Sequence, residues 1–474
     1  MTGRSSFFGY VNCWKIKIFI IFVILLKRYF EMGADMRASF GGKLVAILAA
    51  AGSAIGLGSI WRFPYVAGEN GGAAFLLVYL LAIFVVGIPV MVAEFAVGRA
   101  TKKNAVGGYR QLAKGWRWLG YSGIIAALFI SGYYYIIAGW SLEYFVNSFG
   151  SLYNEGVDFR TQFGIFQTSW RPLLYMVIFV VLTHIIIVRG VQDGIEKASK
   201  VMMPMLFVIL IFMAIWVAFM PGAGAGYEFF LKPDFAKAFS ADTIFSAVGQ
   251  AFFSLSVGMG CMVTYASYFD KKTNLVGTSF SVSLLTLVVA ILAGLVIFPA
   301  VFSAGIAPSE GTSLVFVSLP EVFKGMPLPS LFSAIFFLLL ALASLTSTIS
   351  FHEVLTAYIS EEFNVSRKWA TTITSTLSVV LCVVAMYTTF DVSIPGYNGT
   401  MLSDLFDFIT ASVILPLGGL FTCLFVGWRM KPDFLRGELT NQGTIKSRLY
   451  HVLLFLMRYV SPLLIGYIFV SNFV

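Results

Sequence analysis

The stretch Ala51–Gly72, AGSAIGLGSIWRFPYVAGENGG, combines a hydrophobic segment with residues that interrupt helices. It contains the closely spaced Gly52, Gly56 and Gly58, and Pro64 follows. Glycine in a helix interior costs about 1 kcal/mol and proline about 3 kcal/mol. A helix interrupted at membrane depth leaves amide and carbonyl groups without partners, and lipid cannot supply them. Such groups therefore line a cavity, where amides at the start of a half-helix bind an anion and free carbonyls bind a cation.

A second interrupted segment lies in the middle of the chain. Gly249–Tyr268, GQAFFSLSVGMGCMVTYASY, is hydrophobic but contains Gly258 and Gly260. Two glycine-interrupted helices at corresponding positions of two halves are typical of transporters with an inverted repeat and a binding site near the bilayer midplane. The alternative is small-residue packing between uninterrupted helices. Lone glycines suit such packing better than GxG clusters flanked by Ser and Thr, so we expect an interruption.

The composition indicates an integral membrane protein. Of 474 residues, 58% are hydrophobic and 12% are charged, whereas soluble domains have about 25% charged residues. The net charge of +9 is expected from basic cytoplasmic loops, and no nucleic-acid partner is predicted. Cys13, Cys261, Cys382 and Cys423 form no CxxC pair, so neither a disulfide framework nor a zinc site is indicated. The sequence shows no nucleophile–base pair, phosphate loop or metal cluster, so we do not expect an enzyme.

Long apolar runs predict about eleven membrane-spanning helices, each long enough to cross a bilayer with tilt. They are expected at 43–67, 73–98, 119–147, 172–188, 194–219, 242–269, 276–304, 329–361, 367–388, 401–427 and 448–472. The predicted fold class is an all-α integral membrane protein, an inverted five-helix repeat in which helices 1 and 6 are unwound.

The predicted organisation is one domain with an N-terminal extension. Residues 1–35 contain the apolar run Ile18–Leu26, which is shorter than the about 20 residues that span a bilayer. We interpret them as an extension outside the functional protein; a signal peptide is the alternative, although no small-residue cleavage site precedes Lys43. Residues 36–474 are expected to form a single transporter domain, with repeats at 43–219 and 242–427 and an extra helix at 448–472.

Charge in one loop predicts the orientation. The loop 99–118 has six basic residues and no acidic residue: Arg99, Lys102, Lys103, Arg110, Lys114 and Arg117. The positive-inside rule places this loop in the cytoplasm. The N-terminus is then cytoplasmic, and an odd number of spans puts the C-terminus outside. The predicted location is the cell inner (plasma) membrane, and the sequence leaves a homodimer open.

Eight stretches of the chain resemble one family closely. From about Arg37 to the C-terminus they occur in this order: GLGSIWRFPYVAGENGGAAF, GIPVMVAEFAVGR, YYYIIAGWSL, RGVQDGIEKASKVMMP, GQAFFSLSVGMG, TYASY, LTSTISFHEV and PLGGLFTCLFVGW. They are similar to the neurotransmitter:sodium symporter family, to which the bacterial leucine transporter belongs. The number of spans resembles the shorter bacterial amino-acid transporters of this family.

The resemblance implies an amino-acid substrate. Gly56 stands where monoamine carriers have an aspartate, which leaves room for the carboxylate of the substrate. Amides of Ala54–Gly58 and the Tyr134 hydroxyl are expected to bind that carboxylate, and carbonyls of Phe253–Ser256 the ammonium. The implied substrate-binding residues are Ser53, Ala54, Gly56, Leu57, Gly58, Ile130, Tyr134, Phe253, Ser254, Ser256, Met259, Ser347 and Phe351. The lining is mainly apolar and favours a hydrophobic or aromatic amino acid, although the flexible Met259 can adapt the pocket to other shapes.

The resemblance also implies two sodium sites. The second site would use Gly52, Ile55, Ala343, Thr346 and Ser347. The first would use Ala54, Ser59, Ser254 and Thr286. Ser59 and Thr286 stand in place of family asparagines and have shorter side chains. This first site is therefore weak, remodelled through water, or lost.

Chloride dependence stays open. Tyr79, Gln250 and Ser254 match parts of the family's chloride site. Ala290, however, lies near the position where chloride-dependent members have a serine and chloride-independent members have an acid. The residues therefore do not distinguish the two kinds of transporter.

Two charged pairs match the gates of this family. Arg62 and Asp407 match the outer pair, with Tyr134 and Phe253 as the lid beneath. Arg37 and Glu361 match the inner pair, with Ser267 and Tyr268 beside them. Charged groups near membrane helices are costly enough to indicate function. The alternative for Arg37 and Glu361 is anchoring at the membrane interface.

Three other ionisable residues lie within apolar segments. Glu94 is expected to be hydrogen-bonded near the first helix, because an unpaired carboxylate there is expensive. His352 and Glu353 are adjacent and therefore face different sides of a helix. We interpret them as packing and structural partners; a proton-linked role is the alternative.

The predicted function is a sodium-coupled symporter that takes up a hydrophobic or aromatic amino acid by alternating access. Two alternatives remain because a fold does not fix a function. One is a non-transporting amino-acid sensor or receptor, which would bind substrate without accumulating it. The other is an ion channel, whose currents would far exceed substrate flux.

Overall fold

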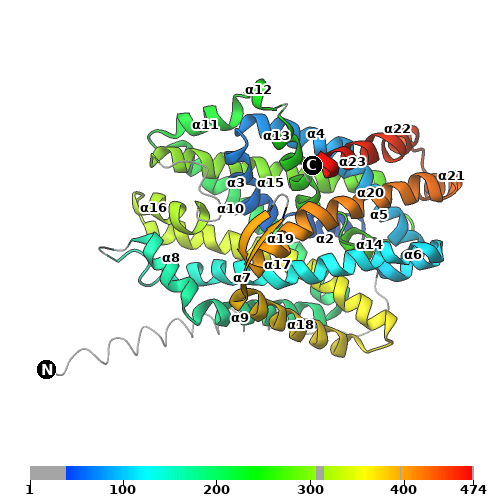
Figure 1. Cartoon of the computed structure of the whole chain (residues 1–474), viewed down its shortest axis with the longest axis horizontal. Helices are drawn as coiled ribbons and strands as arrows, with labels where there is room; N and C mark the ends of the chain where they lie inside the picture. Colours follow the sequence, from blue (N-terminus) through cyan, green and yellow to red (C-terminus); the bar gives the residue numbers. More distant parts are fainter. Residues whose placement is uncertain are drawn as a thin grey trace.

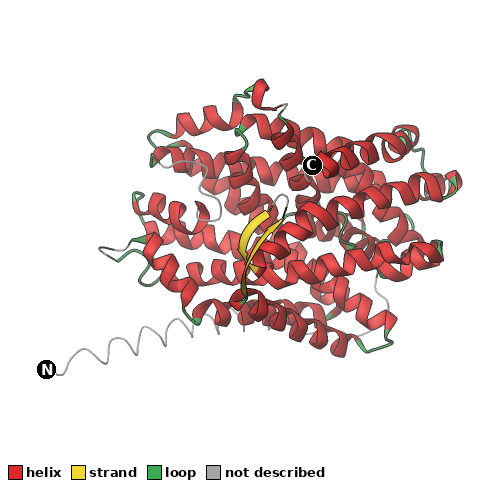
Figure 2. Ribbon diagram, viewed as in Figure 1, coloured by secondary structure: helices red, strands yellow, loops and turns green. Residues whose placement is uncertain are grey.

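A computed structural model describes residues 39–154, 156, 158–238, 240–305, 314–394 and 397–471. In this part of the chain the molecule consists almost entirely of helices, as Figure 2 shows. Most of the long helices run along the horizontal direction of Figure 1 and pack side by side. The predicted all-α architecture is confirmed. The predicted extension 1–35 lies outside the described residues.

The helical elements of the first half alternate long helices with short π or 3-10 turns, which are labelled η. They are α2 (Lys43–Ala54), η1 (Gly58–Arg62), α3 (Phe63–Glu69), α4 (Ala73–Ala82), η2 (Ile83–Gly87), α5 (Ile88–Thr101), α6 (Ala105–Leu112), η3 (Lys114–Trp116), α7 (Arg117–Ser148), α8 (Phe159–Thr168), α9 (Arg171–Val188), η4 (Val191–Glu196), α10 (Lys197–Ala218), α11 (Ala223–Leu231) and α12 (Phe235–Ala238).

The second half follows the same pattern and adds one pair of strands. Its elements are α13 (Ala241–Ser254), α14 (Cys261–Ser267), α15 (Leu275–Ser303), η5 (Leu314–Ser318), α16 (Leu319–Lys324), α17 (Pro329–Glu362), α18 (Arg367–Tyr387), β1 (Thr389–Ile394), β2 (Tyr397–Met401), α19 (Leu402–Phe408), η6 (Ile409–Ile414), α20 (Leu415–Leu424), η7 (Phe425–Arg429), α21 (Pro432–Leu439), α22 (Tyr450–Phe455), η8 (Leu456–Val460) and α23 (Ser461–Ser471).

The spans agree closely with the sequence prediction. Among the described residues, nine helices are long and apolar enough to cross a membrane, and the bent pair Lys43–Ala54 and Gly58–Glu69 makes a tenth. The half-helices α13 and α14 together occupy the range expected for one further span, 242–269. They are separated by Leu255–Gly260, so neither half is long enough to span a bilayer alone.

The first and sixth spans are interrupted where the glycines predicted it. Helix α2 ends at Ala54, Ile55 is extended, and the helix resumes at Gly58 with a bend of 54°. In the sixth span, Gly258 has a φ of 83° and its backbone packs against the carbonyl of Leu415. A Cβ atom at this position would overlap that carbonyl. Only glycine combines this φ with so close a backbone approach.

Two long helices frame the interrupted segments. Helices α7 and α17 pack against each other along much of their length, and α17 also contacts α2 and α14. Helix α5 packs on α14, and α13 packs on α4. The interruptions are therefore held between continuous helices that bury their polar groups, as a chain break at membrane depth requires.

The segments between spans contain more regular structure than the sequence pattern indicated. The basic loop forms α6 and η3; we call this end of the molecule, at the right of Figure 1, the basic end. The segment between α15 and α17 contains η5 and α16. Strands β1 and β2 form an antiparallel hairpin between α18 and α19, where no strand was predicted. The sequence of β1, TFDVSI, is rich in the β-branched residues that suit strands.

Candidate substrate and ion site

The first interruption brings a backbone amide against a tyrosine. The N–H of Leu57 donates to the hydroxyl of Tyr134 on α7 at 2.9 Å, and both groups are buried. A Cβ atom at Gly56 would overlap the Ser347 hydroxyl and lie 2.7 Å from the Tyr134 hydroxyl. One at Gly58 would lie 2.7 Å from the ring of Phe253. The two glycines therefore allow the interrupted backbone to approach α7, α13 and α17.

A cavity lies between the two interruptions and the helices α7 and α17. The non-atom space there, open solvent included, is about 340 Å³. The cavity is lined by Ser53, Ala54, Gly56, Gly58, Ile130, Tyr134, Phe253, Ser256, Met259, Cys261, Ser347, Ser350 and Phe351. The structure thus brings together all predicted substrate-binding residues except Leu57 and Ser254, which lie beside the lining. The binding role of each residue stays a prediction.

Two lining residues were missed by the sequence interpretation. Ser350 lies three residues after Ser347 on α17, and this spacing places both on one helix face. Its hydroxyl contacts that of Tyr265 at 3.0 Å. Cys261 is the first residue of α14 and is buried. The helical spacing could have identified Ser350. The position of Cys261 in the lining depends on where α14 begins after the interruption, which the sequence pattern does not indicate.

The apolar part of the lining consists of aromatic and aliphatic side chains. The rings of Tyr134 and Phe351 meet edge to face at 5.4 Å, a favourable aromatic geometry. Ile130 and Met259 complete this side of the cavity. At the interruption, Ser256 Oγ donates to the carbonyl of Ser53 at 2.8 Å, so the two broken spans are joined directly.

Oxygen atoms gather where α17 meets the first interruption. Thr346 Oγ1 lies 3.0 Å from the carbonyl oxygen of Ile55 and 2.8 Å from that of Ala343. Ser347 Oγ lies 3.4 Å from the carbonyl oxygen of Ser53. A Cβ atom at Gly52 would be 3.7 Å from Thr346 Cβ, so the end of α2 packs against the same turn. A hydroxyl donates only one proton, and several neutral oxygens around it suit a small cation.

Of the residues predicted for a first sodium site, two are in contact with each other and two are bonded within their own helices. Thr286 Oγ1 donates to the carbonyl of Val282, four residues earlier on its own helix, at 2.9 Å. Ser59 Oγ lies 3.5 Å from the carbonyl of Ala54. Ser254 Oγ accepts from Gln250 Nε2 at 2.9 Å. Each hydroxyl is thus used in a local contact.

Gln250 connects the first interruption to Arg62, a member of the predicted outer pair. Its Nε2 donates to the carbonyl of Gly58 at 2.6 Å. Its Oε1 accepts from Arg62 at 3.4 Å. Tyr79 and Ala290, which the chloride comparison used, are both buried. These distances do not distinguish a chloride-dependent transporter from an independent one.

The predicted outer pair is in contact. Arg62 Nη2 lies 3.5 Å from Asp407 Oδ2, and both side chains are partly exposed. The guanidinium of Arg62 also lies over the ring of Phe253, 4.9 Å from its centre. Phe253 is only 8% exposed. The cavity is therefore closed on the side away from the basic end.

A buried carboxylate on α17 takes part in the inner closure beside Tyr268. Tyr268 donates to Glu353 Oε1 at 2.7 Å, and Arg367 binds the same carboxylate at 2.5 and 3.0 Å. Glu361 accepts from the backbone and side chain of Asn104 at 3.0 and 3.1 Å. Its predicted partner Arg37 lies outside the described residues, so the inner pair stays a prediction. The sequence interpretation did not identify Glu353, which is fully buried and lies two helical turns before Glu361 on α17.

The three other ionisable residues that the sequence analysis singled out also have polar contacts. Glu94 Oε1 accepts the N–H of Gly258 at 2.6 Å, at the second interruption rather than the first. His352 contacts the hydroxyls of Tyr135 at 2.9 Å and Ser375 at 3.2 Å. His352 and Glu353 therefore face different partners, as their adjacency on a helix predicted. Their packing between α7, α14 and α18 fits a structural role.

Comparison with known proteins agrees with this geometry. Residues 37–155 and 164–474 match the sodium:neurotransmitter symporter family. The "uncharacterized sodium-dependent transporter YhdH" of Bacillus subtilis is 36% identical over 451 residues, which are 93% of this chain and 98% of that protein. An "uncharacterized sodium-dependent transporter" of Haemophilus influenzae is 33% identical over 464 residues, 92% and 98% of the two chains.

The fold has a close counterpart among solved structures. The crystal structure of MhsT in complex with L-phenylalanine superposes with a TM-score of 0.86 at 40% identity. The match covers 92% of this chain and 100% of that one. Fold, spans and sequence agree, so this chain is a multi-pass, sodium-dependent membrane transporter of the sodium:neurotransmitter symporter family.

Proposed function

We propose that the protein couples inward sodium flow to uptake of a hydrophobic or aromatic amino acid by alternating access. The observation that carries the proposal is the buried contact between the Leu57 amide and the Tyr134 hydroxyl beside Gly56. These groups place uncharged hydrogen-bond donors at the start of a half-helix, an arrangement that suits a carboxylate. An acidic side chain in place of Gly56 would clash with Ser347 and Tyr134.

The lining supports the substrate class. The apolar surface of the cavity comes from Ile130, Phe253, Met259 and Phe351. A pocket lined in this way favours a substrate with an apolar side chain. MhsT, at 40% identity, was crystallised with L-phenylalanine, and this supports an aromatic substrate here. The ammonium would bind carbonyls at the second interruption, because free carbonyls attract a cation.

Sodium would bind first at the oxygens around Thr346. The carbonyls of Ile55 and Ala343 belong to different spans, so an ion there would hold the interrupted helix against α17. Ser347 contacts the carbonyl of Ser53 and lies next to Gly56. Ion and substrate would then share one wall, which gives a physical basis for coupling. The first site, with its locally bonded hydroxyls, would contribute less.

Transport would alternate between two closures. On one side Arg62 and Asp407 separate to admit substrate, and on the other Tyr268 leaves Glu353 to release it. The positive-inside rule supports a cytoplasmic basic end in the plasma membrane, with the N-terminus inside. The interruptions at corresponding places support the inverted repeat of 43–219 and 242–427 within one domain.

The test is uptake of labelled phenylalanine, leucine, tryptophan, tyrosine and alanine into proteoliposomes, with and without an inward sodium gradient. The expected result is sodium-driven accumulation of an aromatic or large aliphatic amino acid. Tight binding without accumulation under any ion gradient would identify a sensor. Currents far larger than the substrate flux would identify a channel. Repeating the uptake without chloride determines whether that ion takes part.

A further inference from the structure

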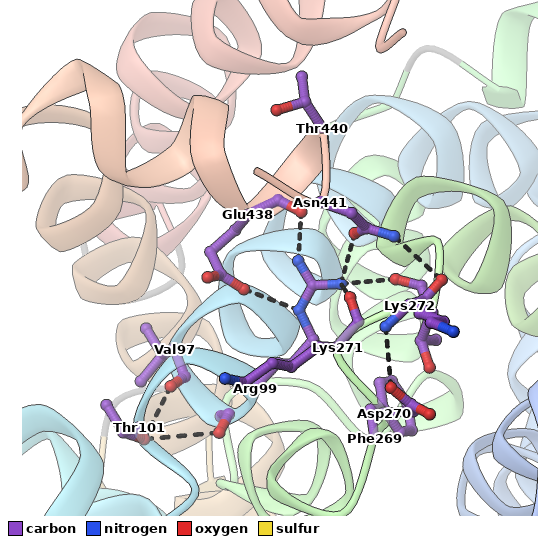
Figure 3. Close-up of polar contacts among 12 residues, drawn as sticks. Val97, Arg99, Thr101, Phe269, Asp270, Lys271, Lys272, Glu438, Thr440 and Asn441 are labelled. Carbon is purple, nitrogen blue, oxygen red and sulfur yellow. Dashed lines mark hydrogen bonds and ion pairs between the residues drawn. The ribbon is translucent and has the colours of Figure 1, made fainter. Parts of the chain in front are cut away.

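Arg99 lies at the end of α5 in a dense polar cluster, which Figure 3 shows. The residue is only 5% exposed. Its Nε donates to Glu438 Oε2 at 2.7 Å, and its Nη2 donates to the carbonyl of the same residue. Its Nη1 donates to Asn441 Oδ1 at 2.7 Å. Arg99 therefore binds the end of α21 through a buried, charge-assisted fork.

The same guanidinium binds the loop that follows α14. Nη1 of Arg99 donates to the carbonyl of Thr273 at 2.5 Å and lies 3.5 Å from that of Lys271. Asn441 Nδ2 donates to the carbonyl of Lys272 at 2.9 Å. The Lys102 ammonium donates to the carbonyl of Phe269. Cations at the end of a helix stabilise its free carbonyls, as Lys102 does just after α14, while Arg99 and Asn441 hold the linker between α14 and α15.

Helix α5 also holds the rest of α14. Glu94 accepts the N–H of Gly258 at 2.6 Å, just before α14 begins. Between these two points Gly98 packs against Val263, where any Cβ atom would overlap the Val263 carbonyl. The half-helix is therefore attached to α5 at its start, its middle and its end.

The opposite side of α14 has a different kind of contact. Two tyrosine hydroxyls reach α17: Tyr265 contacts Ser350 at 3.0 Å, and Tyr268 donates to Glu353 at 2.7 Å. A hydrogen bond between two side-chain ends can break by side-chain rotation, without a shift of the backbone. Breaking the contacts on the α5 side would leave the buried Arg99 without its partners, which is costly. The α17 side of α14 can thus open at lower cost than the α5 side.

We propose that Arg99 is a positioning residue that fastens α14 to both α5 and α21, so that the three move as one body when the basic end opens. The Arg99 cluster is Arg99, Lys102, Glu438, Asn441 and the carbonyls of Phe269–Thr273. Because Tyr268 immediately precedes this loop, the cluster also sets the position of the inner closure. The proposal rests on the alternating-access function, and it assigns α21, a short helix outside the spans, to the moving body.

The experiment measures two distances by double electron–electron resonance in the purified full-length chain. Spin labels are attached at exposed positions 272, 433 and 368 through the substitutions Lys272→Cys, Asp433→Cys and Lys368→Cys. Cys13 is replaced by serine, and a chain with the buried Cys261, Cys382 and Cys423 alone serves as the labelling blank. The 272–433 pair lies within the proposed body, and the 368–433 pair reports its movement against α18.

The expected result is a 272–433 distribution that is the same with sodium, with sodium plus amino acid, and with neither. The 368–433 distribution is expected to shift between these conditions. Arg99→Gln should widen the 272–433 distribution and lower uptake about tenfold or more, because a misplacement of about 1 Å can cost about 100-fold. The matched control is Arg436→Gln, which removes the same charge from the exposed face of α21 and should leave both distributions unchanged.

A second variant covers the case in which Arg99→Gln does not fold. Asn441 has a φ of 47°, which glycine adopts without strain, so Asn441→Gly removes the side chain and keeps the backbone. It should also widen the 272–433 distribution. A 272–433 distance that shifts with ligands in the unsubstituted background, or stays narrow in both variants, would overturn the proposal. Failure of the proposed function would appear separately, as absent sodium-driven uptake by the unlabelled chain.

Discussion

The hydroxyl of Tyr134 lies 2.9 Å from the backbone nitrogen of Leu57, so α7 is joined to the first span at its interruption. The contact occupies the space that a side chain at position 56 would need. One hydroxyl therefore stabilises the unwound backbone and can also face a bound carboxylate. The predictions below separate these roles.

Replacing Tyr134 by phenylalanine removes the hydroxyl and keeps the ring. A hydrogen bond to a charged group contributes about 1.5–3 kcal/mol, so we expect the KM for amino-acid uptake to rise about 10- to 100-fold. Tyr121→Phe, at an exposed position of the same helix, is the control. An unchanged KM in Tyr134→Phe would show that the carboxylate binds elsewhere.

A methyl group at position 56 should abolish substrate binding. A Cβ atom there overlaps Ser347 and lies 2.7 Å from the Tyr134 hydroxyl, whereas at Gly249 it meets open space. Overpacking of this kind costs about 1–3 kcal/mol or more. We expect Gly56→Ala to lose binding in a scintillation proximity assay and Gly249→Ala to retain it. Equal binding by the two variants would contradict the assigned position of the carboxylate.

The two predicted sodium sites should differ in their response to loss of a hydroxyl. Thr346 Oγ1 faces carbonyls of two spans, whereas Thr286 Oγ1 is bonded within its own helix. Valine matches threonine in shape, so Thr346→Val is expected to raise the half-saturating sodium concentration about tenfold, the effect of losing roughly 1.4 kcal/mol. Thr286→Val should change it much less.

Sodium titration of initial uptake rates measures both effects. A large shift in Thr286→Val with none in Thr346→Val would reverse the assignment. Comparable shifts in both variants would indicate that the first site also binds sodium in spite of its shorter side chains.

The inner closure should contribute to stability as well as to transport. Glu353 is fully buried and binds both Arg367 and Tyr268. Removing one partner of a buried pair costs about 3–5 kcal/mol, so Glu353→Gln should lower the apparent Tm of the detergent-solubilised protein clearly. Glu362→Gln is the comparison, because its partner Arg110 is 47% exposed and exposed pairs contribute about 0–1 kcal/mol. Fluorescence-detected thermal unfolding reports both values.

Much of the site could be predicted because its determinants are local. Gly56, Gly58, Gly258 and Gly260 mark the interruptions directly, since a glycine cluster in an apolar helix is costly unless the backbone is used. The pair Arg62 and Asp407 was identified by resemblance; the two side chains lie 3.5 Å apart, and their role as a gate stays a prediction. These features depend on residue type and short spacing.

The parts that were missed depend on long-range packing. The hydrogen bond from Tyr268 to Glu353 arises because the end of α14 packs against α17 about two turns before α17 ends. The contact between Arg99 and Glu438 joins residues 339 positions apart. No local pattern indicates which of several acidic residues lies opposite a given base. The hairpin of β1 and β2 was missed because its strands lie in a connecting segment that hydropathy marks only as a break between spans.

The position of α5 in the chain has a consequence for biosynthesis. Glu94 binds a residue 164 positions later, and Arg99 binds one 339 positions later. At about 5–20 residues per second of translation, Arg99 must wait on the order of tens of seconds for its carboxylate. During that time Arg99 lacks its carboxylate, whereas Glu94 gains its backbone partner after about half of that interval. A chain that stops before α21 would therefore contain α5 and α14 without the contact that joins Arg99 to Glu438.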